Sequence, residues 1–167
     1  MDLACCRLRD ARGMVMEMPQ SLSEINIHLV YSTRKRERLI ADAIRPDLHA
    51  YMGGILNHHG CFPIEINSEP DHAHVLFVLG RKVAISKLVT NLKTGATGWL
   101  RDQDLRLARF HWQRGYGAFS VSASKIEAVR IYIRNQRQHH RRFTFQDEYR
   151  ALLRKHGIKW DERYVWD

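Results

Sequence analysis

At 167 residues, the chain is long enough to bury a core of its own but too short for two independent domains. Its 27 lysines and arginines outnumber 18 aspartates and glutamates. The net charge of +9 favours polyanionic partners such as nucleic acid, with a solvated basic surface as the ordinary alternative. No apolar run approaches the ~20 residues that span a bilayer, so we expect no membrane association. Three cysteines without disulfide-framework spacing indicate a reduced, cytoplasmic protein.

The first twenty residues lack the patterns of the rest. They contain no sustained apolar stretch, which argues against a secretory signal, and Met14, Met16 and Met18 are alternative start sites. We therefore expect residues 1–20 to form an extension without ordered structure. Residues 21–167 are expected to form a single domain, because no repeat, low-complexity tract or Pro/Gly-rich linker interrupts them.

Hydrophobic periodicity predicts the elements of this domain, since strands alternate with period two and amphipathic helices repeat every 3.6 residues. In chain order these are a strand at 25–32, a helix at 44–59, strands at 62–66 and 74–79, a helix at 85–100, strand material at 110–112 and 117–121, and helices at 124–138 and 144–157. Pro46 and Gly60 mark the ends of the first helix, and Ser124 and Glu127 form a capping box at the start of the third.

The order of these elements predicts an α+β fold. Strand, helix, strand, strand, helix and strand in succession match ferredoxin-like and RRM-like domains, in which helices pack on one face of an antiparallel sheet. The last two predicted helices extend this unit at the C-terminus. Such a fold hosts many functions, so function has to be inferred from a site.

A histidine pair precedes the most apolar strand. His72 and His74 are two residues apart, so in a strand both imidazoles lie on one face, with Cα atoms ~6.5–7 Å apart, while Ala73 points to the other face. Two such imidazoles can converge on one metal ion, and the rigid apolar strand at 75–79 favours a well-positioned site. The alternative is a pair of ordinary histidines at a turn.

Tyr132 and Gln136 form the second candidate pair. At positions i and i+4 they lie on one face of the third helix, beside its apolar stripe, where core packing of the tyrosine is the alternative. A phenol with a pKa near ~10 is a poor nucleophile at neutral pH unless a base or cation assists it. A divalent metal ion polarises phosphate oxygens, and a Gln136 amide oxygen beside two imidazoles suits Mg²⁺ or Mn²⁺ better than a thiolate zinc site.

Several segments in order resemble one family. Residues 70–76, Pro-Asp-His-Ala-His-Val-Leu, are similar to the histidine–hydrophobic–histidine motif of the HUH endonuclease superfamily. Within it, the chain most resembles the small single-tyrosine, TnpA-type transposases of bacterial insertion sequences. The segments that carry this resemblance are 26–33, 70–76, 112–121, 132–140 and 161–167.

The resemblance implies a mechanism and a set of roles. It makes Tyr132 the nucleophile and His72, His74 and Gln136 the ligands of the divalent metal ion. Attack on a DNA phosphate then leaves a 5′-phosphotyrosine and a free 3′-OH, so the later rejoining needs no ATP. Enzymes of this type are homodimers that recognise hairpins near the ends of the element and cut only single-stranded DNA.

Four neighbouring polar residues are less favoured candidates for the site. Glu65 and Asp71 can act as metal ligands or as partners of ligands, but a strand-exposed charge and a turn residue are the ordinary interpretations. His139 and His140 lie near the end of the third helix, where we interpret them as capping groups or DNA contacts.

Two basic clusters are candidates for binding DNA phosphates, although a basic run is more often a solvated face. They are Arg34, Lys35, Arg36 and Arg38 after the first strand, and Arg134, Arg137, Arg141 and Arg142 around the end of the third helix. Lys87 and Lys93 on the second helix are further candidates, and Trp112 or Tyr116 can stack on unpaired bases.

The sequence thus favours a transposase that nicks and rejoins single-stranded DNA. A replication-initiator or relaxase-type HUH nuclease shares this chemistry but usually carries further domains, and a domesticated transposase is a related alternative. A non-catalytic nucleic-acid-binding module on the same sheet is the alternative from another class. It leaves the set of two histidines, tyrosine and glutamine unexplained.

Overall fold

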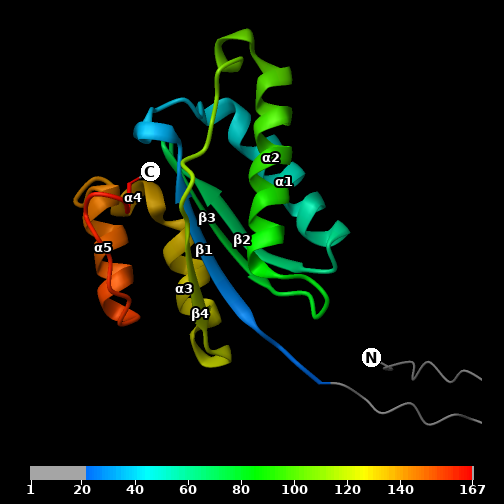
Figure 1. Ribbon diagram of the computed structural model, residues 1–167, viewed down its shortest axis with the longest axis vertical. Coiled ribbons are helices and arrows are strands. Elements are labelled where there is room, and N and C mark those ends of the chain that lie inside the picture. Colours follow the sequence, from blue (N-terminus) through cyan, green and yellow to red (C-terminus); the bar gives the residue numbers. More distant parts are fainter. Residues whose placement is uncertain (1–21, 167) are drawn as a thin grey trace, which may run out of the picture.

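The computed structural model describes residues 22–166, so the predicted extension at 1–20 lies outside the described part of the chain. Four strands form one sheet in the order β2-β3-β1-β4, and every neighbouring pair is antiparallel. The strands are β1 (Asn26–Ser32), β2 (Phe62–Ser68), β3 (His72–Val78) and β4 (Gly117–Val121). This arrangement, visible in Figure 1, confirms the predicted ferredoxin-like sheet.

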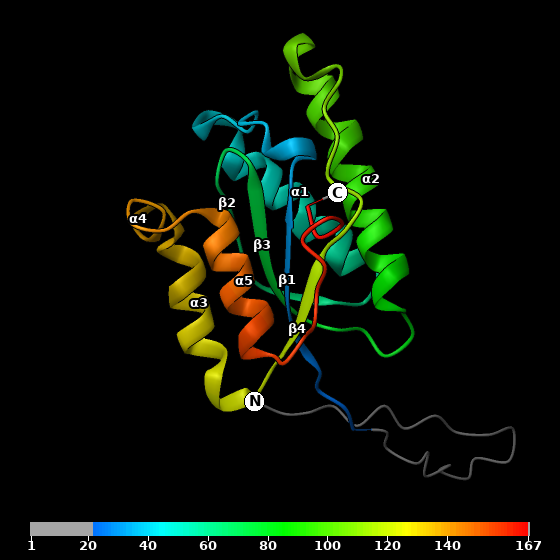
Figure 2. The same ribbon diagram turned by 60° about the vertical axis from the view of Figure 1, so that its left-hand side comes forward.

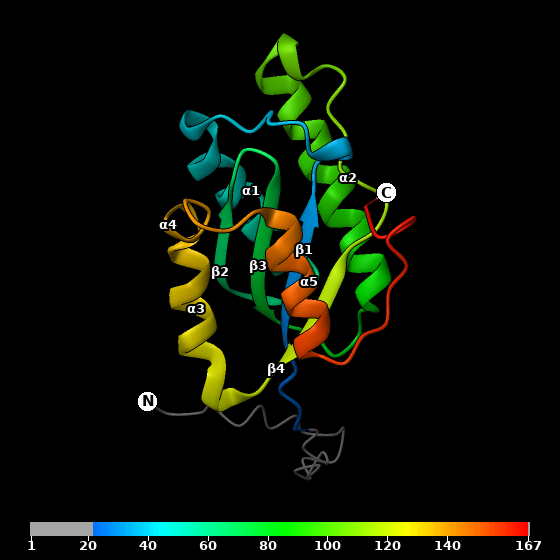
Figure 3. The same ribbon diagram turned by 90° about the vertical axis from the view of Figure 1, so that its left-hand side faces the viewer.

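Helices lie against both faces of the sheet. The first two pack on one face, and the last three lie against the other, as Figures 2 and 3 show. The helices are α1 (Arg45–His58), α2 (Ile85–Gln103), α3 (Ile126–Arg134), α4 (Gln136–His139) and α5 (Phe145–Lys155). Short 3-10 helices occupy Arg34–Arg36, Asp42–Ile44, Leu105–Leu107 and Ala123–Lys125. Among residues 22–166, no helix combines the length and apolarity needed to cross a membrane.

The larger hydrophobic core lies between the sheet and the layer formed by α1 and α2. Alternate residues of the two central strands supply its sheet side, and buried leucines of both helices supply the other side. These residues include Ile27, Leu29 and Tyr31 of β1, Ala73, Val75 and Phe77 of β3, Leu48 of α1, and Leu88 and Leu92 of α2. Each large apolar side chain contributes about 1.5–3 kcal/mol when fully buried, so this layer provides the larger share of apolar stabilisation.

The opposite face of the same strands is polar near its centre. His28 of β1 and His72 and His74 of β3 project there, beside a smaller apolar cluster around Phe119 and Tyr149. Every residue of β1 is buried, so the prediction of a half-buried strand from its alternation is wrong. The reason is that α3 and α5 cover the face that the alternation assigned to solvent.

Two local predictions at the third helix are also wrong. The capping box does not form, because Ser124 lies inside a 3-10 turn and α3 begins at Ile126 without a side-chain cap. The helix predicted to run to residue 138 breaks at Asn135. Asn67 of β2 donates from Nδ2 to the carbonyl oxygen of Ile133 at 2.6 Å, which satisfies one of the free carbonyls at the end of α3.

Candidate active site

The two strand histidines converge as their spacing predicts. His72 and His74 lie on the same face of β3, with ring centroids 5.2 Å apart, and Ala73 points into the opposite core. Asp71 Oδ1 lies 2.7 Å from His72 Nδ1, and His28 Nε2 lies 3.0 Å from His74 Nδ1. These partners fix both rings and leave each Nε2 directed into the site, as outer partners of metal-binding histidines do.

Tyr132 and Gln136 reach the same place from the α3–α4 segment, despite the break between the two helices. Tyr132 Oη and Gln136 Nε2 both donate to Oε1 of Glu148, the second at 2.7 Å. The phenol ring stands edge-on to His74, with ring centroids 6.1 Å apart. The structure therefore brings the four predicted site residues together around one carboxylate.

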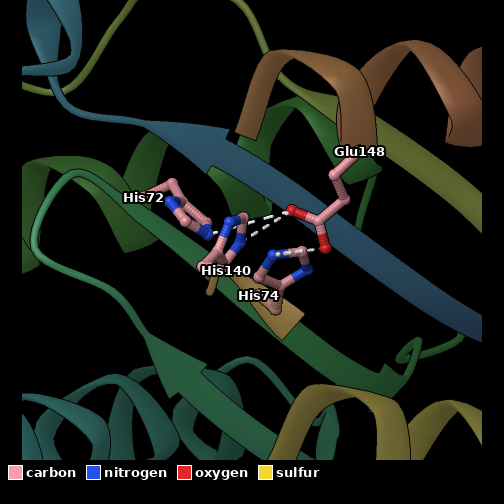
Figure 4. Close-up of side chains that lie close together, drawn as sticks. All are labelled: His72, His74, His140 and Glu148. Carbon is pink, nitrogen blue, oxygen red and sulfur yellow. Dashed lines mark ion pairs between the residues drawn. The ribbon is translucent and has the colours of Figure 1, made fainter. Parts of the chain in front are cut away.

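The sequence predictions missed His28, the partner of His74, and Glu148, which lies at the centre of the site. Glu148 is buried on α5, which begins at Phe145. Thr144 caps this helix, because its side chain accepts a hydrogen bond from the backbone N–H of Asp147. The Glu148 carboxylate lies 3.1 Å from His140 Nε2, 3.5 Å from His74 Nε2 and 3.9 Å from His72 Nε2. Figure 4 marks these ion pairs with dashed lines.

A signal for Glu148 was present in the sequence. Phe145, Glu148, Tyr149 and Leu152 stand at positions i, i+3, i+4 and i+7, so an acidic residue occupies the apolar stripe of an amphipathic helix. A charge at such a position is expected to be paired or to bind a ligand, because burial of an unpaired carboxylate is costly.

His140 also belongs to this cluster. The prediction of a capping or DNA-contact role did not anticipate its approach to Glu148 and to His72, whose ring centroid lies 4.5 Å from its own. Asp71, by contrast, contacts the far nitrogen of His72, and Glu65 forms an ion pair with Arg134 at 2.6 Å. Of the polar neighbours, His140 is thus closest to the centre of the site.

Burial and charge set the protonation states of the cluster. Burial lowers the pKa of His72 to about 4, so this imidazole is neutral at pH 7 and able to bind a cation. Burial alone would raise the pKa of the Glu148 carboxyl, but the imidazoles of His74 and His140 and the Tyr132 hydroxyl hold that pKa well below its usual range. Burial, together with the same carboxylate, raises the pKa of the Tyr132 phenol, which stays a hydrogen-bond donor.

The residues present fit a divalent cation. Five buried polar atoms in the cluster have no hydrogen-bond partner among the described residues, which is uncommon in folded proteins. They are Nε2 of His72, His74 and His140, Gln136 Oε1 and Glu148 Oε2, and of these His140 Nε2 and Glu148 Oε2 are paired only as charges, at 3.1 Å. One ligand atom from each of His72, His74, His140 and Glu148 lies within 4.8 Å of the others, and such a mixture of imidazole nitrogen and carboxylate oxygen binds divalent ions.

A cavity rich in arginine opens next to this cluster. It has a volume of about 650 Å³, and its walls include His72 and His140. We call it the basic cavity; its arginines are Arg38, Arg45, Arg137, Arg141 and Arg142. Both predicted basic clusters contribute to it, the first through Arg38 and the second through three members, although Arg137 also pairs with Asp42 at 2.7 Å.

Other predicted DNA contacts are placed differently. Arg34 and Lys35 are exposed, while Arg36 is half-buried against the Trp166 ring, 5.6 Å from its centroid. Lys93 donates to the carbonyl oxygens of residues 113–115, so it braces a loop, and burial lowers its pKa to about 8. Trp112 is buried against Tyr31 and pairs only through an isolated bridge, so the predictions of a strand at 110–112 and of a stacking surface on Trp112 are wrong.

A ferredoxin-like sheet that carries a histidine pair and a tyrosine in one buried site is the arrangement expected of the HUH class. Comparison with known proteins agrees at the level of family. Residues 21–136 match the family described as "Transposase IS200 like", and the chain belongs to this family. No curated protein sequence matches the chain.

Solved structures share the fold. One, described as a candidate transposase from Deinococcus radiodurans R1, is 19% identical with a TM-score of 0.56, over 73% of this chain and 98% of that one. Another is a REP-associated tyrosine transposase bound to a REP hairpin, 13% identical with a TM-score of 0.53, over 76% of this chain and 74% of that one. The family match ends at Gln136, so α5 and Glu148 lie beyond it.

Proposed function

We propose that this transposase cuts and rejoins single-stranded DNA with Tyr132 as nucleophile, beside a divalent cation held by His72, His74 and Gln136. The observation that carries the proposal is the convergence of Tyr132 and Gln136 on one buried carboxylate that also approaches both histidines. Family membership supports the reaction class, since IS200-like proteins are transposases.

The chemical step follows from the position of the phenol. Tyr132 Oη forms a bond to the phosphorus, and the bond from that phosphorus to the 3′ oxygen breaks. The phenol proton moves first to Glu148 Oε1, which already accepts its hydrogen bond and passes the proton on to solvent water. The departing 3′ oxygen takes up a proton from solvent water to become a 3′-OH. The product is a 5′-phosphotyrosine, which a second 3′-OH attacks to rejoin the strands and release the tyrosine.

The residues around the phenol prepare it for this step. Asp71 and His28 hold the imidazoles, and Glu148 orients the hydroxyl. A bound Mg²⁺ or Mn²⁺ would polarise the phosphate oxygens and favour the phenolate form of Tyr132, because positive charge lowers the pKa of a neighbouring acid. Glu148 and His140 are within reach of the same ion and can replace or supplement Gln136 in its coordination.

We propose that the DNA partner is a single strand with hairpins near the ends of the element, and that the protein acts as a homodimer. The basic cavity beside His72 supports binding of a phosphate backbone. The REP-associated relative of the same fold is bound to a hairpin, which supports a similar substrate here.

The proposal is tested with purified protein, Mn²⁺ or Mg²⁺, and end-labelled single strands that carry the end hairpins of the element. A denaturing gel is expected to show a covalent protein–DNA species that requires the metal ion and disappears in Tyr132→Phe. Cleavage that persists in Tyr132→Phe would overturn the tyrosine mechanism in favour of a hydrolytic nuclease. Hairpin binding without cleavage under any metal would favour the non-catalytic binding module.

A further inference from the structure

A second cavity borders the candidate active site and shares Phe143 with the basic cavity. Its volume is about 590 Å³, within the ~300–1,000 Å³ typical of ligand pockets. It lies between α3, α5 and β4, the elements that stand together in Figure 3, and Tyr132 and Glu148 form part of its wall. We call it the apolar cavity.

The walls of the apolar cavity are mainly carbon. Phe119, Val129 and Leu152 line it together with the small side chains of Ala128 and Ala151. These apolar side chains can pack against the face of a flat ring. Such packing requires no particular pattern of hydrogen bonds.

A few polar residues also line the apolar cavity. Lys125 and Lys155 are exposed residues of the lining and supply positive charge that suits a ligand with a phosphate, while the same lining also includes the carboxylates of Asp147 and Glu148. His139 Nε2 is buried without a hydrogen-bond partner, and its ring stacks on Phe143 with centroids 5.0 Å apart. The preferred ligand is therefore flat, largely apolar on its faces, able to form a hydrogen bond and attached to an anion.

The two cavities meet at one exposed aromatic residue. Phe143 lines both of them and is 53% exposed. The arginines of the basic cavity suit the phosphates of a DNA strand, and the apolar side chains of the other cavity suit one of its bases.

We propose that the apolar cavity receives one unpaired base of single-stranded DNA, from a nucleotide next to the phosphate that Tyr132 attacks. This proposal rests on the proposed function and deepens it. A base seated there holds its own phosphates beside the phenol, since sugar and phosphate are attached to it. The cavity would in this way fix the register of the strand against Tyr132 Oη, and it requires that the nucleotide be unpaired.

The test measures binding rather than catalysis. A fluorescein-labelled oligothymidine of about 15 nucleotides and a strand of equal length with abasic sites are titrated into metal-free protein. Ala128→Leu and Ala151→Leu narrow the apolar cavity with a good helix former that has no aromatic face, while Ala50→Leu is a matched change at an exposed position of α1.

The wild-type protein and Ala50→Leu are expected to bind oligothymidine at least about fivefold more tightly than the abasic strand, because stacking is worth ~1–3 kcal/mol per base. Both cavity variants are expected to lose most of this preference while binding the abasic strand as the wild type does. Equal binding of the two strands by the wild-type protein would overturn the proposal. A preference that both correctly folded cavity variants retain would overturn it as well.

Failure of the base-binding proposal can be distinguished from failure of the proposed transposase mechanism. A base preference that depends on the apolar cavity, in a protein that never forms an adduct through Tyr132, would support the cavity and refute the transposase mechanism. Adducts that form at the wild-type rate in both cavity variants would support the mechanism and refute the cavity.

Discussion

The two faces of the central sheet are built from the same strands but differ in role: one packs in the apolar core and the other carries the candidate active site. On the face toward α1 and α2, Leu29 and Val75 are fully buried among other apolar side chains. On the face toward α3 and α5, His28 and His74 are also buried but contact each other, and His74 contacts Glu148. Because side chains alternate along a strand, a register shift of one residue would exchange these two sets.

The difference shows how the fold separates stability from chemistry. The apolar face stabilises the domain without specific partners, since the hydrophobic effect is non-directional. The face that carries the histidines makes fewer apolar contacts. Burial of its polar atoms costs free energy unless a hydrogen-bond partner or a ligand satisfies them. Substitutions on the two faces should therefore change different measured quantities.

The largest effect is expected from the nucleophile. Tyr132→Phe keeps the ring but removes the attacking oxygen, so covalent adduct formation should fall by at least ~10³-fold, as for other lost nucleophiles. Adducts with labelled single strands are quantified on denaturing gels, with Tyr149→Phe as the control. Tyr149 packs on the same side of the sheet, and its variant should keep adduct formation near the wild-type level.

The next effect concerns the apolar face. Leu29→Ala should lower the free energy of unfolding by about 2–5 kcal/mol, because it removes a fully buried side chain and leaves a cavity. Urea denaturation measures this loss, and Mn²⁺ affinity of the folded fraction should stay unchanged. A large drop in intrinsic Mn²⁺ affinity in this variant would show that the two faces are not separate.

Glu148 provides the reciprocal test on the histidine face. Glu148→Gln keeps the shape but removes the negative charge next to three imidazoles, so Mn²⁺ affinity should fall by about 10–100-fold. Isothermal titration calorimetry measures the affinity, and Glu127→Gln, an exposed glutamate of α3, is the matched control. Unchanged affinity in Glu148→Gln would restrict this residue to positioning Tyr132.

A further prediction concerns the dependence of stability on pH. Burial lowers the pKa of His72 and of His49 to about 4, below the ordinary ~6.5 of the unfolded chain. The unfolded state therefore binds more protons between these values, and stability should fall as pH drops from about 6.5 toward 4.

Thermal unfolding at several pH values measures this dependence, and His49→Gln, on α1, should remove only part of it. Saturating Mn²⁺ should raise the melting temperature at pH 7 and progressively less at lower pH, because protons compete for the same imidazoles. A metal-induced increase that is constant from pH 7 to 5 would contradict cation binding by histidine.

The sequence was sufficient for what depends on local periodicity. The sheet, α1, α2 and α5 follow from apolar spacing and from signals such as Pro46 and Gly60, and His72 and His74 share a face because a strand alternates. The residues that needed tertiary information were predicted less well. The break at Asn135 is accompanied by a hydrogen bond from Asn67 of a distant strand to the carbonyl of Ile133, a contact that local propensity cannot express.

The candidate site shows the same limit. Tyr132 and Gln136 were found because they stand together in the sequence, whereas Glu148 meets them only when α5 folds back over the sheet. Its acidic side chain in an apolar stripe was the available signal. Trp112, in turn, looked like a surface aromatic until the packing against Tyr31 placed it in the core.

The most direct measurement traps the covalent intermediate and identifies the residue that carries it. A hairpin-bearing single strand with sulfur in place of the bridging 3′ oxygen releases a thiol that rejoins poorly, so the adduct accumulates. After trypsin digestion, mass spectrometry is expected to find the nucleotide on the peptide of residues 131–134, attached to Tyr132. A nucleotide on Tyr116, Tyr149 or Tyr164, or cleavage with no modified peptide, would contradict the proposed mechanism.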